Sequence, residues 1–143
     1  MKNNKWYVIS TFVLGCIVIN FAGRILSDRL QLPLWLDSFG TVTAAYVLGP
    51  FCAAMVGMTV NLTYGILYSW TNMFYAVVSA MVGITTGICV KKGFLKNLYG
   101  VLSTSFLVAV LSVTLSVPFN YLYCDGSTQN IWGDGVIESM EKV

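Results

Sequence analysis

Apolar residues along the chain form long runs that are separated by short polar breaks. Residues 38–90 contain no charged side chain, and a stretch of this length exceeds two bilayer crossings at roughly 20 residues per helix. A backbone inside hydrocarbon must satisfy its own hydrogen bonds, so such segments form helices that pack on helices. The pattern predicts an all-α, polytopic membrane helix bundle.

Breaks in the apolar pattern divide the chain into spans. Gly49-Pro50 interrupts the long run once, and the polar aromatic sequence of residues 68–72 interrupts it again. The expected spans cover residues 6–23, 39–48, 51–67, 73–90 and 98–123. The second of these is too short to cross a bilayer alone, and interrupted helices of this kind often line a cavity.

The last part of the chain differs from the spans before it. Residues 131–143 start like another helix, but this segment is too short and too acidic to cross. We therefore expect a single transmembrane domain over residues 1–143, with five spans and a sixth that is truncated. The alternative is that this last helix is peripheral. We do not expect a cleaved signal peptide in the first apolar run, because the residues after Cys16 remain apolar.

Lysines set the expected orientation. Lys2 and Lys5 precede the first span, and Lys91, Lys92 and Lys96 follow the fourth. Short cytoplasmic loops of membrane proteins carry an excess of Lys and Arg. The amino terminus and the loop after the fourth span are therefore predicted to be cytoplasmic.

Composition excludes several classes of function. The chain has no His, and its four Cys show no metal-like spacing, so we expect no metal site and no cofactor. No Ser/His/Asp set or pair of intramembrane carboxylates is present, which argues against an enzyme and against a proton relay. A net charge of +2 without a basic run excludes nucleic-acid binding.

Polar side chains within the spans gather toward their outer ends. Asn61, Tyr64 and Tyr68 are spaced i, i+3, i+7 and share one helix face. Further polar and aromatic residues lie at the same level, namely Asn20, Arg24, Asp37, Trp70, Asn72, Asn120 and Trp132. This convergence indicates a small-molecule pocket. The alternative is that the aromatic residues form an interfacial belt and the asparagines bridge helices.

Small residues form stripes at four-residue spacing, which lets helix backbones approach closely. The members considered for docking a partner protein are Ala45, Gly49, Ala53, Gly57, Ser79, Gly83 and Gly87. The same residues could instead pack the helices of the bundle against one another, which is the more common use of such stripes.

Four segments carry a resemblance to a known family. They are NFAGR (20–24), LPLWLDSFGT (32–41), LGP (48–50) and VNLTYG (60–65). These segments resemble the substrate-binding S components of energy-coupling factor (ECF) transporters, and the resemblance covers residues 6–92 best. It implies a six-helix protein of the prokaryotic plasma membrane that captures a vitamin or similar micronutrient at the outer side. It also implies docking on a transmembrane coupling subunit that carries two ATPase subunits.

The resemblance also implies which residues contact the ligand. The candidate substrate-binding residues are Asp37, Asn61, Tyr64, Tyr68, Asn72 and Asn120, with Trp70 and Asp134 as additions. Amides and aromatic rings in an apolar pocket suit many vitamins, so the substrate is not identified. Two other functions stay open: a membrane sensor or interaction module that binds a ligand without transporting it, and a structural membrane protein.

Overall fold

The computed structural model describes residues 3–32, 36–127 and 131–141, and all regular structure in these ranges is helical, as predicted. The elements are α1 (Asn3–Leu30), η1 (Leu36–Ser38), α2 (Phe39–Val47), α3 (Pro50–Leu67), α4 (Asn72–Lys91), η2 (Phe94–Lys96), α5 (Leu98–Tyr123) and α6 (Ile131–Glu141). Residues 33–35 of the resemblance segment and residues 142–143 of the expected partial helix lie outside the described residues.

Four helices in the described ranges, α1, α3, α4 and α5, are long and apolar enough to cross a membrane. Helix α2 has nine residues, which is about 14 Å at 1.5 Å per residue, against roughly 30 Å of hydrocarbon. It is therefore a half-length helix and not the fifth full span. Helix α1 continues beyond the apolar stretch 6–23 to Leu30, and Arg29 in its last turn interacts favourably with the helix dipole.

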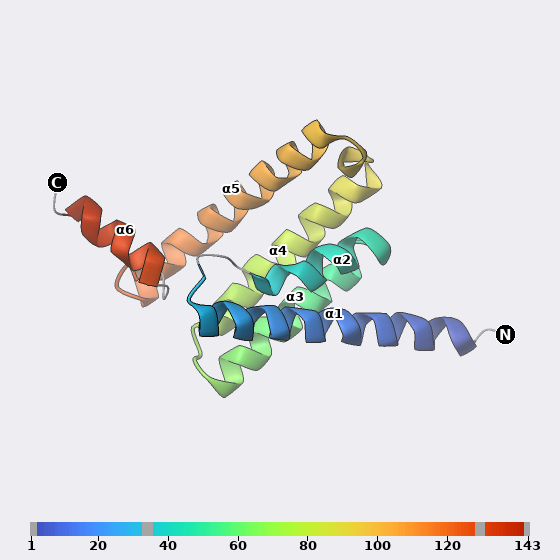
Figure 1. Cartoon of the computed structure of the whole chain (residues 1–143), viewed down its shortest axis with the longest axis horizontal. Helices are drawn as coiled ribbons and strands as arrows, with labels where there is room; N and C mark the ends of the chain where they lie inside the picture. The colour runs from blue at the N-terminus through green and yellow to red at the C-terminus, as the bar shows by residue number, and fades with distance from the viewer. Residues whose placement is uncertain (1–2, 33–35, 128–130, 142–143) are drawn as a thin grey trace.

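The helices form a bundle around an α3–α4 pair (Figure 1). Helix α1 runs along one side of this pair, and α2 packs against α1, α3 and α4. Helix α5 folds back along α4 on the side away from α1, and α6 lies beyond the far end of α5 (Figure 1). Helix α5 therefore has α4 as its main helical neighbour.

Small residues hold α3 close to α4. A Cβ atom on Gly83 would lie 2.7 Å from the carbonyl carbon of Ala53, and one on Gly57 would lie 2.9 Å from the carbonyl oxygen of Ser79. Gly49 has φ +93° at the turn where α2 meets Pro50, a conformation that favours glycine. These residues are used inside the bundle, which is one of the two uses that the sequence left open.

The remaining docking candidates also lie at contacts within the bundle. Ala45 and Ala53 are fully buried, and a Cβ atom on Gly87 would lie 2.5 Å from Cα of Pro50. These contacts show the stripes packing helices within the bundle, and their use for docking a partner protein stays a prediction.

Large apolar side chains cover the outside of the bundle. Phe51, Ile66 and Phe106 are 76%, 73% and 73% exposed. A protein surface in contact with water rarely carries so many large apolar side chains. Lipid satisfies such a surface, and the helices satisfy their own backbone hydrogen bonds. The architecture is that of a multi-pass membrane protein.

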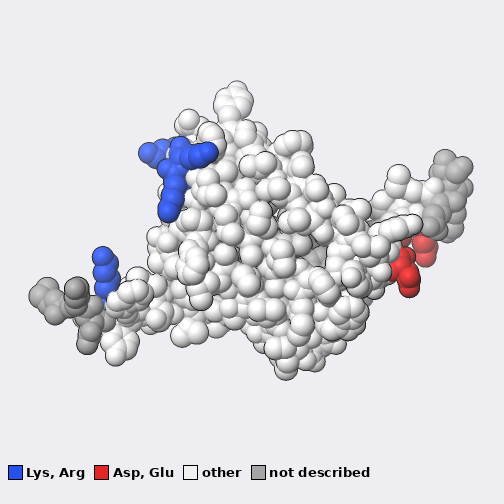
Figure 2. Space-filling view, turned by 180° about the vertical axis from the view of Figure 1, so that it is seen from behind, with Lys and Arg blue, Asp and Glu red and all other residues white. Residues whose placement is uncertain are grey.

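Charged side chains lie at the two ends of the molecule. Lysines gather over the start of α1 and the α4–α5 connection, and the visible acidic side chains lie near α6 at the opposite side (Figure 2). We call the first region, with Lys5, Lys91, Lys92 and Lys96, the lysine end. The opposite end holds the α3–α4 turn, residues 68–71, and we call it the turn end.

Candidate functional site

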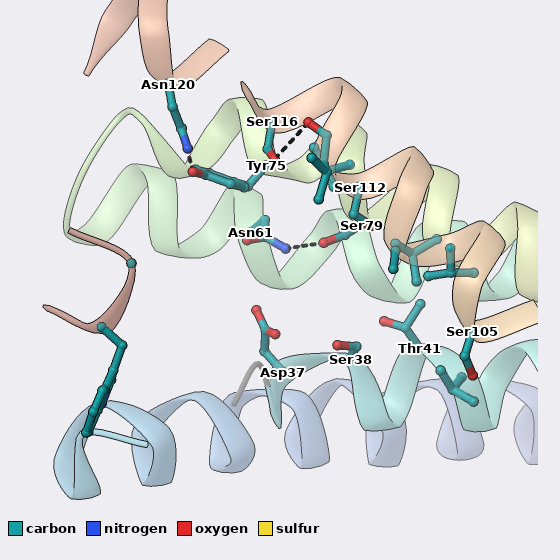
Figure 3. Close-up of a pocket in the computed structure, with 18 residues that line it drawn as sticks. Asp37, Ser38, Thr41, Asn61, Tyr75, Ser79, Ser105, Ser112, Ser116 and Asn120 are labelled. Carbon is teal, nitrogen blue, oxygen red and sulfur yellow. Dashed lines mark hydrogen bonds between the residues drawn. The ribbon is translucent and has the colours of Figure 1, made fainter. Parts of the chain in front are cut away.

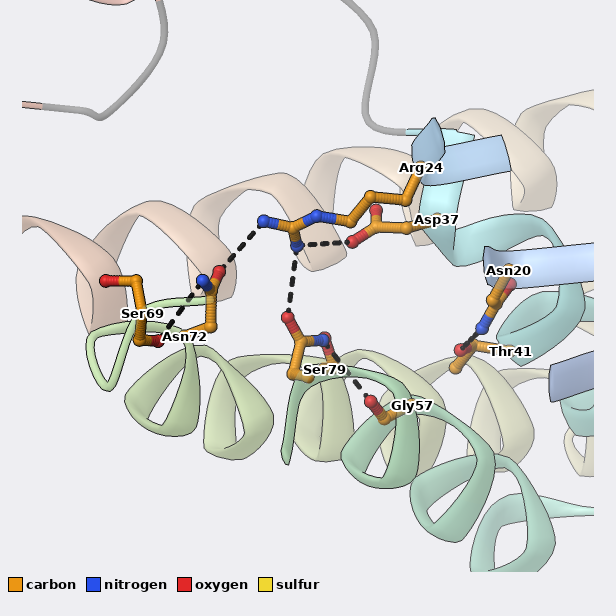
Figure 4. Close-up of polar contacts among 9 residues, drawn as sticks. Asn20, Arg24, Asp37, Thr41, Gly57, Ser69, Asn72 and Ser79 are labelled. Carbon is orange, nitrogen blue, oxygen red and sulfur yellow. Dashed lines mark hydrogen bonds and ion pairs between the residues drawn. The ribbon is translucent and has the colours of Figure 1, made fainter. Parts of the chain in front are cut away.

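An arginine on α1 forms the centre of a polar cluster near the turn end (Figure 4). One guanidinium nitrogen of Arg24 lies 3.3 Å from the carboxylate of Asp37 and donates to Oδ1 of Asn61 over 3.4 Å. The other donates to Oδ1 of Asn72 over 2.8 Å, and Cζ lies 4.6 Å from the ring centroid of Tyr64. We call these five residues the arginine hub. It joins α1, η1, α3 and α4.

Burial governs the electrostatics of the arginine hub. The Arg24 and Asp37 side chains are only 16% and 12% exposed. Burial raises the pKa of the Asp37 carboxyl above its ordinary value, while the charge of Arg24 and its hydrogen bond oppose that rise. The planar guanidinium presents several donors at fixed angles, so one side chain can serve three oxygen acceptors and a ring.

Each asparagine side chain of the hub forms hydrogen bonds through both its amide oxygen and its amide nitrogen. Nδ2 of Asn61 donates to the Ser79 hydroxyl over 2.7 Å, while its oxygen faces Arg24. Nδ2 of Asn72 donates to the carbonyl of Ser69 over 3.3 Å. These two asparagines are therefore held in one orientation by partners on either side.

A second buried amide bridges helices. Nδ2 of Asn20 donates to the Thr41 hydroxyl over 2.9 Å, and Oδ1 of Asn20 accepts from the backbone N–H of Gly40 over 2.6 Å. This side chain joins α1 to α2, so Asn20 acts as a helix bridge, the alternative that the sequence left open for the asparagines.

A cavity of about 650 Å³ lies beside the arginine hub (Figure 3). Its walls come from η1, α2, α4 and α5, with Asn61 of α3 and Trp132 of α6. The apolar part is mainly valine, and the polar lining residues are Asp37, Ser38, Thr41, Asn61, Tyr75, Ser79, Ser105, Ser112, Ser116 and Asn120. This volume and this mixture of apolar walls with a few polar groups are typical of small-molecule sites.

Two hydrogen bonds hold the walls of the cavity. The Tyr75 hydroxyl donates to Oδ1 of Asn120 over 2.6 Å and joins α4 to α5. The indole N–H of Trp132 donates to the carbonyl of Gln31 over 2.8 Å and ties the start of α6 to the end of α1. The cavity is therefore bounded at the turn end by α6.

The structure divides the candidate substrate-binding residues into groups. Asp37, Asn61 and Asn120 line the cavity. Tyr64 and Asn72 belong to the arginine hub and do not line it. Tyr64 and Asn72 therefore contact Arg24 and not the space inside the cavity.

The other three candidates lie away from the cavity lining. Tyr68 is 75% exposed and packs on the ring of Tyr64 at 5.1 Å between centroids. Trp70 is 55% exposed and packs edge-on against Phe74 at 5.6 Å between centroids. Asp134 accepts a hydrogen bond from the Ser127 hydroxyl over 2.9 Å.

Sequence reasoning did not select the hydroxyl-bearing wall on α5. Ser105, Ser112 and Ser116 line the cavity and are spaced by seven and four residues, which places them on one face of a helix. This spacing along one helix face was the signal that could have identified them. Arg24 was noted near the pocket but was not among the candidate contacts, although it organises four of them.

Comparisons with protein-family models, with curated proteins and with solved structures each found no match to this chain. The arginine hub and the adjacent cavity are therefore the basis for the functional conclusion.

Proposed function

We propose that this protein captures a small molecule in the cavity beside the arginine hub while it is embedded in a membrane. The cavity itself is the observation that carries the proposal: about 650 Å³, with valine walls and hydroxyl, amide and carboxylate groups that face inward. Polar groups at membrane depth are costly unless they find partners. A bound molecule with complementary polar groups would supply those partners.

We further propose that the chain is the substrate-capture subunit of an ECF-type importer in a prokaryotic plasma membrane. The segments that carry this resemblance supply residues of the hub: NFAGR contributes Arg24, LPLWLDSFGT contributes Asp37, and VNLTYG contributes Asn61 and Tyr64. The ligand would be a vitamin-like micronutrient. A transmembrane coupling subunit and two ATPase subunits would drive its uptake.

The charge distribution supports a cytoplasmic amino terminus. The lysine end carries Lys5, Lys91, Lys92 and Lys96, and such an excess marks cytoplasmic segments. The turn end, with the arginine hub, would then face outward. A ligand would reach the cavity from outside, as substrate capture for import requires.

Native mass spectrometry of the full chain, purified gently from cells grown in rich medium, tests the proposal. We expect a discrete co-purifying mass. Val108→Trp should abolish it by filling the cavity that Val108 lines, and Val110→Trp is the matched control, since Val110 is 45% exposed on the same helix. Absence of a bound mass in the unmodified protein, or equal retention in both variants, would contradict the proposal.

An uptake assay separates the importer from the sensor. Cells that contain the protein and its coupling and ATPase subunits should accumulate the molecule identified by mass spectrometry, and the Val108→Trp variant should not. Binding without accumulation would favour the sensor.

A further inference from the structure

We propose that the cavity selects neutral or cationic molecules that donate hydrogen bonds, and that it rejects anions such as phosphate esters and carboxylates. This inference rests on the proposed capture function and adds the charge class of the ligand. It follows from the side chains of the cavity wall and from where Arg24 directs its guanidinium.

The charged group that faces the cavity is the carboxylate of Asp37, and the cation that compensates it, Arg24, lies outside the lining. Among the described residues that line the cavity, Asp37 is the only charged side chain, and its carboxylate points inward (Figure 3). Arg24 does not line the cavity, because its guanidinium is directed to Asp37, Asn61 and Asn72 and lies over Tyr64. An anion in the cavity would meet a carboxylate and no free cationic donor.

Two of the three α5 serines that line the cavity have hydroxyls available for a ligand, whereas Ser116 donates to the carbonyl of Val113 over 3.4 Å. Elsewhere on α5, the hydroxyls of Ser103, Thr104 and Thr114 donate to carbonyls of their own helix at 2.7–2.8 Å. In the part of the chain that the structure describes, Ser105 and Ser112 make no such bond, and both line the cavity. A serine hydroxyl can donate or accept by rotation, so this wall suits ligand groups of either kind.

Together these features define the ligand class. An apolar body would lie along the valines of α4 and α5, hydroxyl or amide groups would meet the serines, and an N–H or O–H group would donate to the carboxylate of Asp37. The corresponding phosphate ester would have to bring its negative charge beside that carboxylate, which costs binding free energy.

Cysteine labelling tests the charge preference without knowledge of the ligand. Ser112→Cys is introduced into a chain whose four native cysteines are replaced by Ala, and the protein is placed in nanodiscs. The rates of reaction with a trimethylammonium methanethiosulfonate and with its sulfonate analogue are measured. Each rate is divided by the rate of the same reagent with a free thiol in solution.

We expect the normalised rate of the cationic reagent to exceed that of the anionic reagent about twofold, because Arg24 offsets part of the attraction that the nearer carboxylate exerts. Asp37→Asn leaves Arg24 uncompensated and should bring the ratio below one. Should this variant not fold, about 1 M salt should lower the ratio in the Ser112→Cys protein alone, through screening.

Equal rates, or a preference for the anionic reagent, would overturn the charge selection and leave the capture function standing. If neither reagent reacts at residue 112, water does not reach the cavity, and the capture function fails together with this inference. Val110→Cys, on the exposed side of α5, is the control for labelling from the lipid and should react with neither reagent.

Discussion

Replacing Arg24 by Gln should destabilise the protein strongly, because it leaves the carboxylate of Asp37 buried beside no cation. The change removes the ion pair at 3.3 Å, the charged hydrogen bond to Asn72 at 2.8 Å and the cation over the ring of Tyr64. The contact to Asn61 at 3.4 Å is long and contributes little.

The magnitude follows from burial. Breaking a fully buried ion pair by removing one partner costs about 3–5 kcal/mol, and the Asp37 side chain is 12% exposed. A neutral amide at position 24 restores part of the hydrogen bonding that is lost, worth about 1 kcal/mol. We therefore expect the free energy of unfolding to fall by about 3 kcal/mol at pH 8.

The cost should depend on pH. Burial raises the pKa of Asp37, and Arg24 opposes that rise, so removal of Arg24 raises the folded-state pKa further. A carboxyl with a raised folded-state pKa is favoured in its protonated form, and the stability that it contributes is lost as pH rises through that value. At pH 5 the destabilisation should therefore shrink to about 1–2 kcal/mol, which reflects hydrogen bonds alone.

The assay is unfolding in mixed micelles, titrated with sodium dodecyl sulfate at pH 5 and at pH 8. Asp37→Asn in the Arg24→Gln background should recover about 1–2 kcal/mol at pH 8 and little at pH 5, since it removes the unpaired charge. Arg29→Gln is the control: Arg29 is exposed on the same helix, and its loss should change stability by about 0.5 kcal/mol or less. A cost below about 1 kcal/mol at pH 8, or the same cost at both pH values without rescue, would refute the reasoning.

Three further predictions concern the bundle and the cavity. Gly83→Ala places a methyl group 2.7 Å from the α3 backbone and should lower stability in the same titration by about 1–3 kcal/mol; Gly15→Ala, with open space around it, should not lower it. Ser112→Ala should reduce the amount of the co-purifying molecule seen by native mass spectrometry, and Ser103→Ala, whose hydroxyl bonds its own helix at 2.8 Å, should not; equal amounts would remove the serine wall from the site. Trp132→Phe keeps a ring but removes the donor to the end of α1, so release of the bound molecule should accelerate roughly fivefold, the effect of about 1 kcal/mol.

The sequence predicted the helices well, because lipid leaves a backbone few alternatives. Uncharged stretches had to be helical, and Gly49-Pro50 had to interrupt them, since glycine permits the positive φ of +93° and proline begins the next helix. Helix α4 runs from Asn72 to Lys91, which is one residue longer at each end than the expected range 73–90.

The arginine hub was less predictable. Arg24 meets partners 13, 37 and 48 residues away, and nothing local specifies which helices will bring those positions together. The expected span ended at residue 23, immediately before Arg24, since a charge usually marks the end of a span. In the structure α1 continues, and its arginine turns inward because Asp37 and two amides compensate its charge.

Among the helices, α5 contacts mainly α4, so one wall of the cavity depends on a single helix–helix interface. At the start of α5, Gly100 lies directly against the carbonyl of Phe94. Toward its other end, the ring centroids of Phe74 and Phe119 lie 4.1 Å apart in a stacked pair. Substitutions along this interface therefore act on the cavity wall, while the contacts that α1 to α4 make with one another lie elsewhere in the bundle.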